Sequence, residues 1–227
     1  MNRLISWVRL ILLMFPAIAL LGCSILPFLS SGTPTPINTM SYDAPVSLTI
    51  KTGSLLPGTS ISYSGKSDTG AAKILLAGLL APKQIGDTVD WEGTPVPNVK
   101  VRLNTRVLTF DDQSITLAGT AHIEIANIKV QSGGTPGAAV IEFSAPVTFS
   151  LKTNEAIPGS LVTYAGSSPN GAQFLGLEGY AYRKQLDSLQ YVGHLASKVY
   201  LKLDLRVLSF SDSGAVVGGT ATIRIEQ

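Results

Sequence analysis

The fold is decided by a stretch that occurs twice, as VKVRLNTRVLTFDDQSITLAGTAHIEI at residues 99–125 and as VYLKLDLRVLSFSDSGAVVGGTATIRI at residues 199–225. The two stretches share twelve identities in 27 aligned positions. Apolar and polar residues alternate along both, which is the pattern of a β-strand with one face in the core. The polar break at residues 111–114 predicts a turn, so we expect each stretch to form a hairpin of two long strands.

A second pair of similar stretches lies upstream of the first. APVSLTIKTGSLLPGTSISYSG begins at Ala44, and APVTFSLKTNEAIPGSLVTYAG begins at Ala145. The offset between the copies falls from 101 here to 100 in the hairpin stretch, which places the loss of one residue near residues 87–93. This period is much longer than that of a solenoid, so it indicates duplication of a whole small domain. We therefore predict an all-β chain of two tandem homologous domains, each a small β-sandwich or β-barrel.

The domain boundaries follow from the repeat. We expect repeat 1 at residues 44–130, a linker at 131–137 within a hairpin-style connection, and repeat 2 at 138–227. One segment is ambiguous, because GAAKILLAGLLAPK at 70–83 is rich in the helix formers Ala and Leu. Its counterpart GAQFLGLEGYAYRK at 171–184 has two interior glycines and two tyrosines, so strand is the favoured prediction for both.

The chain begins with a short basic segment that contains Arg3 and Arg9. An uncharged apolar run, LILLMFPAIALL, follows at residues 10–21, and Gly22 and Cys23 end it. This order of basic, apolar and small residues is the layout of a secretory signal.

The sequence LLGC at residues 20–23 resembles the lipobox of bacterial lipoproteins, and the resemblance covers only the first 23 residues. It implies that residues 1–22 are a signal peptide that is removed. Cys23 would then be lipidated, with fatty acyl groups such as palmitate, and would become the first residue of the mature chain. The Ser-, Thr- and Pro-rich residues 23–43 would form an extended flexible tether.

Two alternatives to lipidation stay open. The apolar run can be read as continuing to Phe28 or Leu29, which gives about 20 residues, enough for an uncleaved membrane span. Cys23 would otherwise be only a small apolar residue of the leader. Arg3 and Arg9 favour a cytoplasmic N-terminus. With either membrane attachment, we expect the folded part to be extracytoplasmic, at the cell membrane or the outer membrane.

Charge argues against one class of partner. The chain has 17 basic and 15 acidic residues, and Arg3 and Arg9 account for the whole excess. Nucleic-acid binding requires clustered Lys and Arg, so no nucleic-acid partner is expected. The single cysteine also excludes an intramolecular disulfide and a multi-cysteine metal site.

Catalytic motifs are not found in the sequence. It contains no Gly-x-Ser-x-Gly elbow, phosphate-binding glycine loop or His-Glu-x-x-His helix, and its two histidines, His122 and His194, are not shared between the copies. Asp87, Asp90 and Glu92 could hold calcium through their oxygens, but they lack the spacing of a calcium loop. We therefore predict no catalytic residues, no metal site, no cofactor and no enzymatic activity.

Residues shared by both copies are candidates for a common binding role. The tyrosine pair could line a ligand surface, although a half-buried scaffold tyrosine with a hydrogen-bonded hydroxyl is the favoured interpretation. The arginine pair could bind an anion or an acidic partner, although a solvated strand face is the simpler explanation. These candidates are Tyr63 with Tyr164 and Arg106 with Arg206.

Aromatic residues gather in the second copy. Phe174, Tyr180, Tyr182 and Tyr191 could face a cavity for an apolar molecule, with Tyr180 and Tyr182 as binding candidates, or they could be ordinary core. The leading functional hypothesis is a non-enzymatic, lipid-anchored envelope protein with a binding or structural role. Its partners would be the membrane, through the lipid, and envelope proteins. The alternative is a carrier of a small apolar ligand in a β-barrel cavity.

Overall fold

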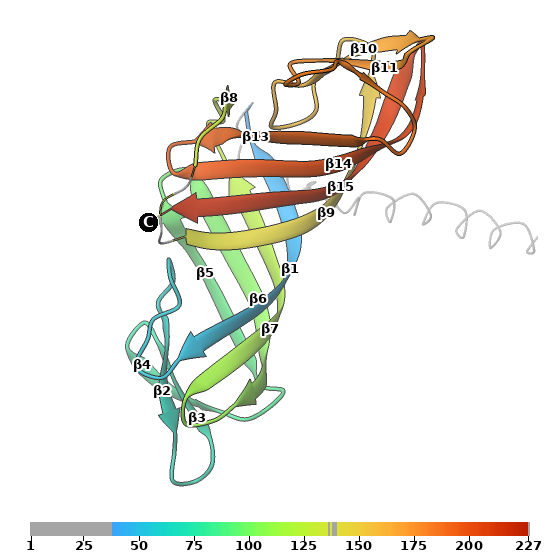
Figure 1. Ribbon diagram of the computed structural model, residues 1–227. Coiled ribbons are helices and arrows are strands. Elements are labelled where there is room, and N and C mark those ends of the chain that lie inside the picture. Colours follow the sequence, from blue (N-terminus) through green and yellow to red (C-terminus); the bar gives the residue numbers. More distant parts are fainter. Residues whose placement is uncertain (1–37, 136, 138–139, 227) are drawn as a thin grey trace, which may run out of the picture. The chain divides into compact units, whose positions relative to one another are not determined.

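The long strands of this protein form two similar antiparallel sheets, one from each copy of the duplicated sequence (Figure 1). The computed structural model describes residues 38–135, 137 and 140–226, and within them it contains strands and no helix. The predicted signal peptide, the predicted lipidation site Cys23 and most of the predicted tether lie outside the described residues. The all-β prediction is confirmed.

Repeat 1 consists of a long sheet and a small one. The long sheet has the order β1-β7-β6-β5, and the small sheet has the order β2-β3-β4. Neither sheet is closed on itself, so the barrel alternative is wrong for this repeat. The strands are β1 (Met40–Lys51), β2 (Ile61–Lys66), β3 (Ala72–Leu76), β4 (Leu79–Lys83), β5 (Thr88–Val96), β6 (Val99–Phe110) and β7 (Ser114–Ile125).

Repeat 2 has the same topology with one additional edge strand. Its long sheet has the order β8-β13-β14-β15-β9, and its small sheet has the order β10-β11-β12. These sheets are also open, so no barrel encloses an interior here. The strands are β8 (Gln131–Ser132), β9 (Val140–Lys152), β10 (Thr163–Ser168), β11 (Gly171–Leu175), β12 (Tyr182–Arg183), β13 (Ser188–Ala196), β14 (Val199–Ser211) and β15 (Gly214–Glu226).

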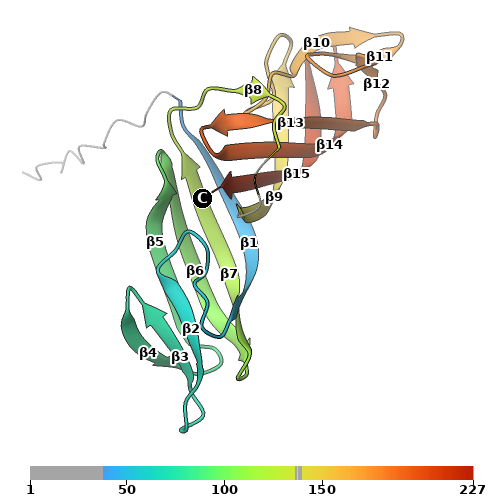
Figure 2. The same cartoon turned by 60° about the vertical axis from the view of Figure 1, so that its left-hand side comes forward.

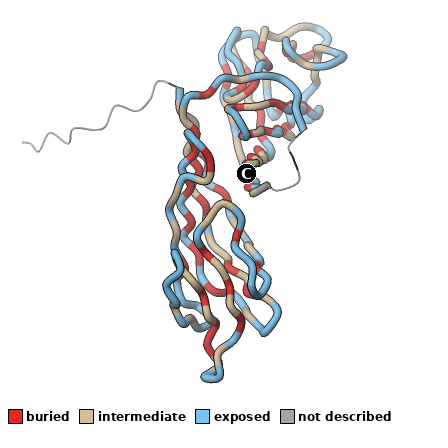
Figure 3. Tube along the Cα trace, turned by 90° about the vertical axis from the view of Figure 1, so that its left-hand side faces the viewer, coloured by how far each residue is buried: buried red, intermediate tan, exposed pale blue. Residues whose placement is uncertain are grey.

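The alternation in the sequence is realised as a buried face and an exposed face on the long strands (Figure 3). Val99, Val101 and Leu103 are buried, whereas Lys100 and Arg102 between them are exposed. The alternation is shifted by a bulge near the end of β6, where the register shifts between Val107 and Thr109. The same shift occurs in β14 between Val207 and Ser209.

The buried side chains of both copies form one contiguous cluster, and β1 contacts β9. Apolar burial of this kind contributes most of the favourable free energy of folding.

Two sequence predictions about boundaries and connections need correction, and a third is confirmed. β1 begins at Met40, so residues 40–43 belong to the strand rather than to the tether. The connection between the repeats is not a hairpin, because β8 and β9 lie on opposite edges of one sheet. Segment 70–83 is a strand hairpin, as predicted, with Leu76 opposite Leu79.

The residue lost between the copies lies in the turn of the small sheet, not near residues 87–93. Lys66 pairs with Ala72 in repeat 1, and Ser167 pairs with Ala172 in repeat 2, so the second turn is one residue shorter. The offset is therefore already 100 after this turn. Arg183, which pairs with Ala172, is the counterpart of Lys83, which pairs with Ala72.

Candidate functional site

Two hollows of repeat 2 share the lining residues Arg183 and Ser188. A larger hollow of about 620 Å³ lies elsewhere, beside Pro95, Asn98 and Lys198. The first hollow has a volume of about 460 Å³, and its walls include Glu178, Gln190 and Tyr191. The second has a volume of about 320 Å³, and its lining is Asn170, Tyr180, Tyr182, Arg183, Lys184, Asp187 and Ser188. Both volumes fall within the range of about 300–1,000 Å³ that is typical of small-molecule sites. We call the two hollows together the Arg183 groove.

The groove exists because a hairpin that is closed in repeat 1 is open in repeat 2 (Figure 2). In repeat 1, Leu76 pairs with Leu79 across a turn of Ala77 and Gly78, both with positive φ. Two such residues make a tight hairpin turn whose twist suits the flanking strands. In repeat 2 the equivalent pairing ends early, and residues 176–181 form a loop instead.

Glycine is required where this loop starts. Gly176 has a φ of +79°, and a Cβ at this position would lie 2.3 Å from the carbonyl oxygen of Leu161. A side chain is excluded both by the left-handed backbone and by this close approach. The loop therefore leaves β11 directly against the backbone of Leu161, just before β10.

Arg183 holds the other end of the loop. Its Nε donates to the carbonyl of Ser188 at 2.9 Å, and its Nη1 donates to the carbonyl of Tyr182 at 2.9 Å and to that of Tyr180. The guanidinium forms no ion pair with a described acidic residue. Neutral backbone carbonyls therefore fix the orientation of the side chain. Arg183 can therefore both shape the loop and attract polar groups of a ligand.

Two tyrosines of this loop region present their rings to the second hollow. The ring centroids of Tyr180 and Tyr182 are 5.5 Å apart with planes at 52°, and Tyr180 is 65% exposed. The amide of Phe174 donates to the carbonyl of Ala181 at 2.8 Å, which fixes the backbone between the two tyrosines. An exposed tyrosine and a partly buried one on a constrained backbone offer a ligand apolar surface together with hydroxyl groups.

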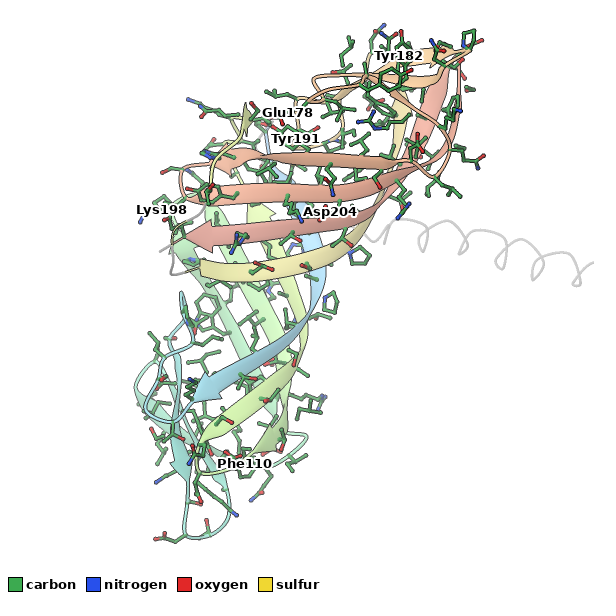
Figure 4. The ribbon with its side chains drawn as sticks, in the orientation of Figure 1. Phe110, Glu178, Tyr182, Tyr191, Lys198 and Asp204 are labelled. Atoms are coloured by element: carbon green, nitrogen blue, oxygen red, sulfur yellow. The ribbon has the colours of Figure 1, made fainter. Side chains whose placement is uncertain are left out.

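The first hollow is bounded by a third tyrosine on β13. Tyr191 is buried except at the groove, and its hydroxyl lies 3.3 Å from the carbonyl of Gln131. Burial raises the pKa of Tyr191. Gly193 makes room for the ring, because a Cβ there would lie 2.5 Å from the Tyr191 hydroxyl. In Figure 4, Glu178 and Tyr191 lie beside β13, and Tyr182 lies nearer to β10 and β11.

The tyrosines shared by both copies are scaffold residues rather than ligand contacts. Tyr63 and Tyr164 have no exposed surface, and their hydroxyls donate to the carbonyls of Asp111 and Ser211. Burial is the main cause of their raised pKa values. The suggestion that Tyr63 and Tyr164 line a ligand surface is therefore wrong, because both rings are buried and neither is accessible to a ligand.

The shared arginines brace turns in the same way in both repeats. Arg106 donates from Nη1 to the carbonyl of Gly86 at 2.9 Å, and Arg206 donates to that of Leu186 at 2.9 Å. Both lie on the outer face of a long sheet, and neither lines the Arg183 groove. Arginine occurs at this position in both copies because it stabilises the same turn of the fold.

The acidic residues considered for calcium have other contacts. Asp87 accepts a hydrogen bond from the amide of Gln84 at 2.7 Å. Glu92 pairs with Lys100 at 2.7 Å and with Arg102 at 2.6 Å, and hydrogen bonds from these two residues lower its pKa. In the described part of the chain, no group of three or more His, Cys, Asp or Glu residues could hold a metal ion.

The predicted aromatic group is split by the structure. Phe174 is fully buried against Tyr164, with ring centroids 5.4 Å apart, whereas Tyr180 and Tyr182 face the groove. Sequence reasoning missed Glu178, Arg183 and Gln190. The available signal was the difference between the copies, since LLAGLLAPK at residues 75–83 corresponds to LGLEGYAYR at residues 175–183.

Comparison with family models, with curated proteins and with solved structures found no match to this chain. Within residues 38–135, 137 and 140–226, no helix is long and apolar enough to cross a membrane.

Proposed function

We propose that this protein is a non-enzymatic binding protein of the cell envelope, attached to the outer face of a membrane through lipidated Cys23. The observation that carries the binding role is the Arg183 groove, which is built in repeat 2 and has no equivalent hairpin opening in repeat 1. The two copies share the scaffold residues, so this difference is not required by the fold. The attachment rests on the basic, apolar and LLGC segments of the N-terminus.

The non-enzymatic part of the proposal is supported by how the groove residues are used. Arg183 is committed to backbone carbonyls, and the carboxylate of Asp187 accepts from the amide of Lys184 at 2.7 Å. Neither histidine belongs to the groove: His122 pairs with Asp43 at 2.7 Å, and His194 packs against Tyr200. An arrangement of hydrogen-bonded side chains around an open hollow suits recognition of a ligand.

The alternative of an apolar carrier has less support. The sheets are open, and the apolar recess bordered by Leu56, Trp91 and Phe143 has a volume of only about 10 Å³. That volume is about the size of one water molecule. A bound apolar ligand would have to displace core side chains, which is costly in a closely packed interior.

The attachment is tested by expressing the full chain and its Cys23→Ala variant in a bacterial host that is fed a labelled fatty acid. We expect label in the wild type and no label in the variant, which should keep residues 1–22 and so have a different mass. Ser30→Ala, in the same segment, is the matched control and should behave as wild type. If Cys23→Ala fractionates with membranes at unchanged mass, the lipid anchor is wrong.

The binding role is tested by crosslinking whole cells and recovering the protein. Tyr180→Ala removes an exposed side chain of the groove, and Leu80→Ala changes the equivalent position of repeat 1. We expect wild-type protein and the Leu80→Ala variant to recover the same envelope component, and the Tyr180→Ala variant to recover less of it. Recovery that does not depend on Tyr180 would contradict the placement of the site.

A further inference from the structure

The chemistry of the Arg183 groove narrows the class of ligand. In the second hollow, the rings of Tyr180 and Tyr182 share the lining with Arg183 and Asn170, whose side chains have planar, hydrogen-bonding ends. The first hollow, which also contains Arg183, adds the carboxylate of Glu178. A ligand that contacts both the tyrosine rings and the polar side chains must have an apolar face. It must also carry hydrogen-bond donors and acceptors around the edge of that face. We infer that the groove binds a neutral glycan, an inference that rests on the proposed binding function.

The charge balance of the groove supports a neutral ligand. Two cations, Arg183 and Lys184, are matched by two anions, Glu178 and Asp187. A polyanion requires an excess of Lys and Arg, and a basic peptide requires an excess of acids. The hydroxyl groups of a sugar can accept from the guanidinium and donate to the carboxylate without adding net charge.

The shape of the groove favours a glycan over a protein surface. Each hollow has the volume of a small-molecule site, and Arg183 and Ser188 belong to both, so the hollows adjoin. A stable protein interface usually covers about 800 Å² per partner around an apolar centre. The two adjoining hollows are instead small and lined by polar and aromatic side chains. Such a lining suits the successive sugar units of an oligosaccharide.

Repeat 1 provides an internal control for this inference. By the register of the small sheets, the counterparts of Glu178, Tyr180, Tyr182 and Arg183 are Gly78, Leu80, Pro82 and Lys83. These residues offer neither an aromatic ring nor a carboxylate. Repeat 1 therefore lacks the tyrosine pair and the loop carboxylate, although Trp91 occupies the position of Tyr191.

The test is a calorimetric titration of the full chain in a sugar-free detergent. The probes are the neutral tetrasaccharides of β-1,4-linked N-acetylglucosamine, of cellulose and of amylose, with oligogalacturonate as the anionic comparison. We expect at least one neutral probe to bind and oligogalacturonate to bind more weakly. Tyr180→Ala and Tyr182→Ala should each weaken binding by about threefold to tenfold, because each removes one stacking face. Leu80→Ala and Pro82→Ala should leave the affinity unchanged.

Two outcomes would overturn the inference, and they differ in what they imply. If no neutral probe binds but crosslinking still recovers a component in a Tyr180-dependent manner, the groove is a site for another ligand class and only the glycan inference fails. If neither binding nor crosslinking depends on Tyr180, the proposed function fails as well. A thermal unfolding midpoint equal to that of wild type for Tyr180→Ala, expected for a residue that is 65% exposed, separates both outcomes from misfolding.

Discussion

The hydroxyl of Tyr164 donates a hydrogen bond to the backbone carbonyl of Ser211 and so joins the small sheet of repeat 2 to the end of β14. Tyr63 makes the same bond to Asp111 in repeat 1. The chain has kept this bond in both copies although Ser211 and Asp111 differ, because the acceptor is a main-chain atom. The tyrosines at these two positions therefore stabilise the fold of each repeat and are not part of a binding site.

Removal of this hydroxyl should destabilise the protein without affecting the groove. Tyr164→Phe leaves the carbonyl of Ser211 without its donor in a partly buried place, which costs about 1–2 kcal/mol. The free energy of unfolding, measured with urea, should fall by that amount. Tyr180→Phe, at an exposed position, is the control and should change it by less than about 0.5 kcal/mol. Equal stability of the two variants would show that the bond contributes nothing.

The raised tyrosine pKa values predict a loss of stability in alkali. Burial is the main cause of the raised pKa of Tyr63, Tyr164 and Tyr191, relative to the ordinary tyrosine value of about 10. Above about pH 10 the unfolded chain loses these protons while the folded chain retains them, so the folded state binds more protons. Stability is therefore complete below pH 10 and decreases as pH rises toward the folded pKa values.

This dependence is measured by urea unfolding at intervals between pH 8 and pH 11.5. The double variant Tyr63→Phe and Tyr164→Phe should start from a lower stability but show a smaller decrease above pH 10. A free energy of unfolding that stays level up to pH 11.5 in the wild type would contradict the raised pKa values.

Two adjacent glycines on β15 should respond differently to alanine. A Cβ at Gly219 would lie 2.1 Å from the carbonyl oxygen of Asp204, so the paired strands would have to separate. A Cβ at Gly218 would lie 3.0 Å from the end of the Leu208 side chain, which is partly exposed and can move. We expect Gly219→Ala to cost about 1–3 kcal/mol of unfolding free energy, and Gly218→Ala clearly less. The reverse order would mean that the strand pairing is misplaced.

Arg183 should control the order of the loop at residues 176–181. Arg183→Lys keeps the charge, but an ammonium cannot hold three carbonyls with the fixed geometry of a guanidinium. Amide hydrogen exchange in residues 176–181 should therefore become about tenfold faster, which corresponds to about 1.4 kcal/mol, while global stability stays within about 0.5 kcal/mol. Lys184→Arg is the adjacent control. If the amide hydrogen exchange rates of residues 176–181 are unchanged in Arg183→Lys, Arg183 does not order the loop.

Periodicity was sufficient to predict the strands, because each long strand has one buried face. The alternation of Val99 and Val101 with Lys100 and Arg102 identified both the strand and its inward side. The bulge after Val107 was not predictable in this way, because it changes the register without a glycine or proline to mark it. The tight turn at Ala77 and Gly78 also lacks the Asn-Gly pair that usually signals such turns.

The groove could not be predicted because residues distant in sequence form it. Gln190 comes from β13, Ser132 from the edge strand β8, and Glu178 from the loop between β11 and β12. No periodic pattern connects these positions. Tyr180 and Tyr182 were found from the sequence because aromatic residues stand out by type, whereas Arg183 looked like an ordinary strand residue.

The central claim is that the folded repeats are held at a membrane through Cys23, and the mass of the intact protein tests it most directly. The full chain would be produced in a bacterial host, extracted from its membranes with detergent, and measured by mass spectrometry. We predict the mass of residues 23–227 plus that of a diacylglyceryl group, with or without one further acyl chain. A chain that still begins at Met1, or one that carries no lipid on Cys23, would contradict the account.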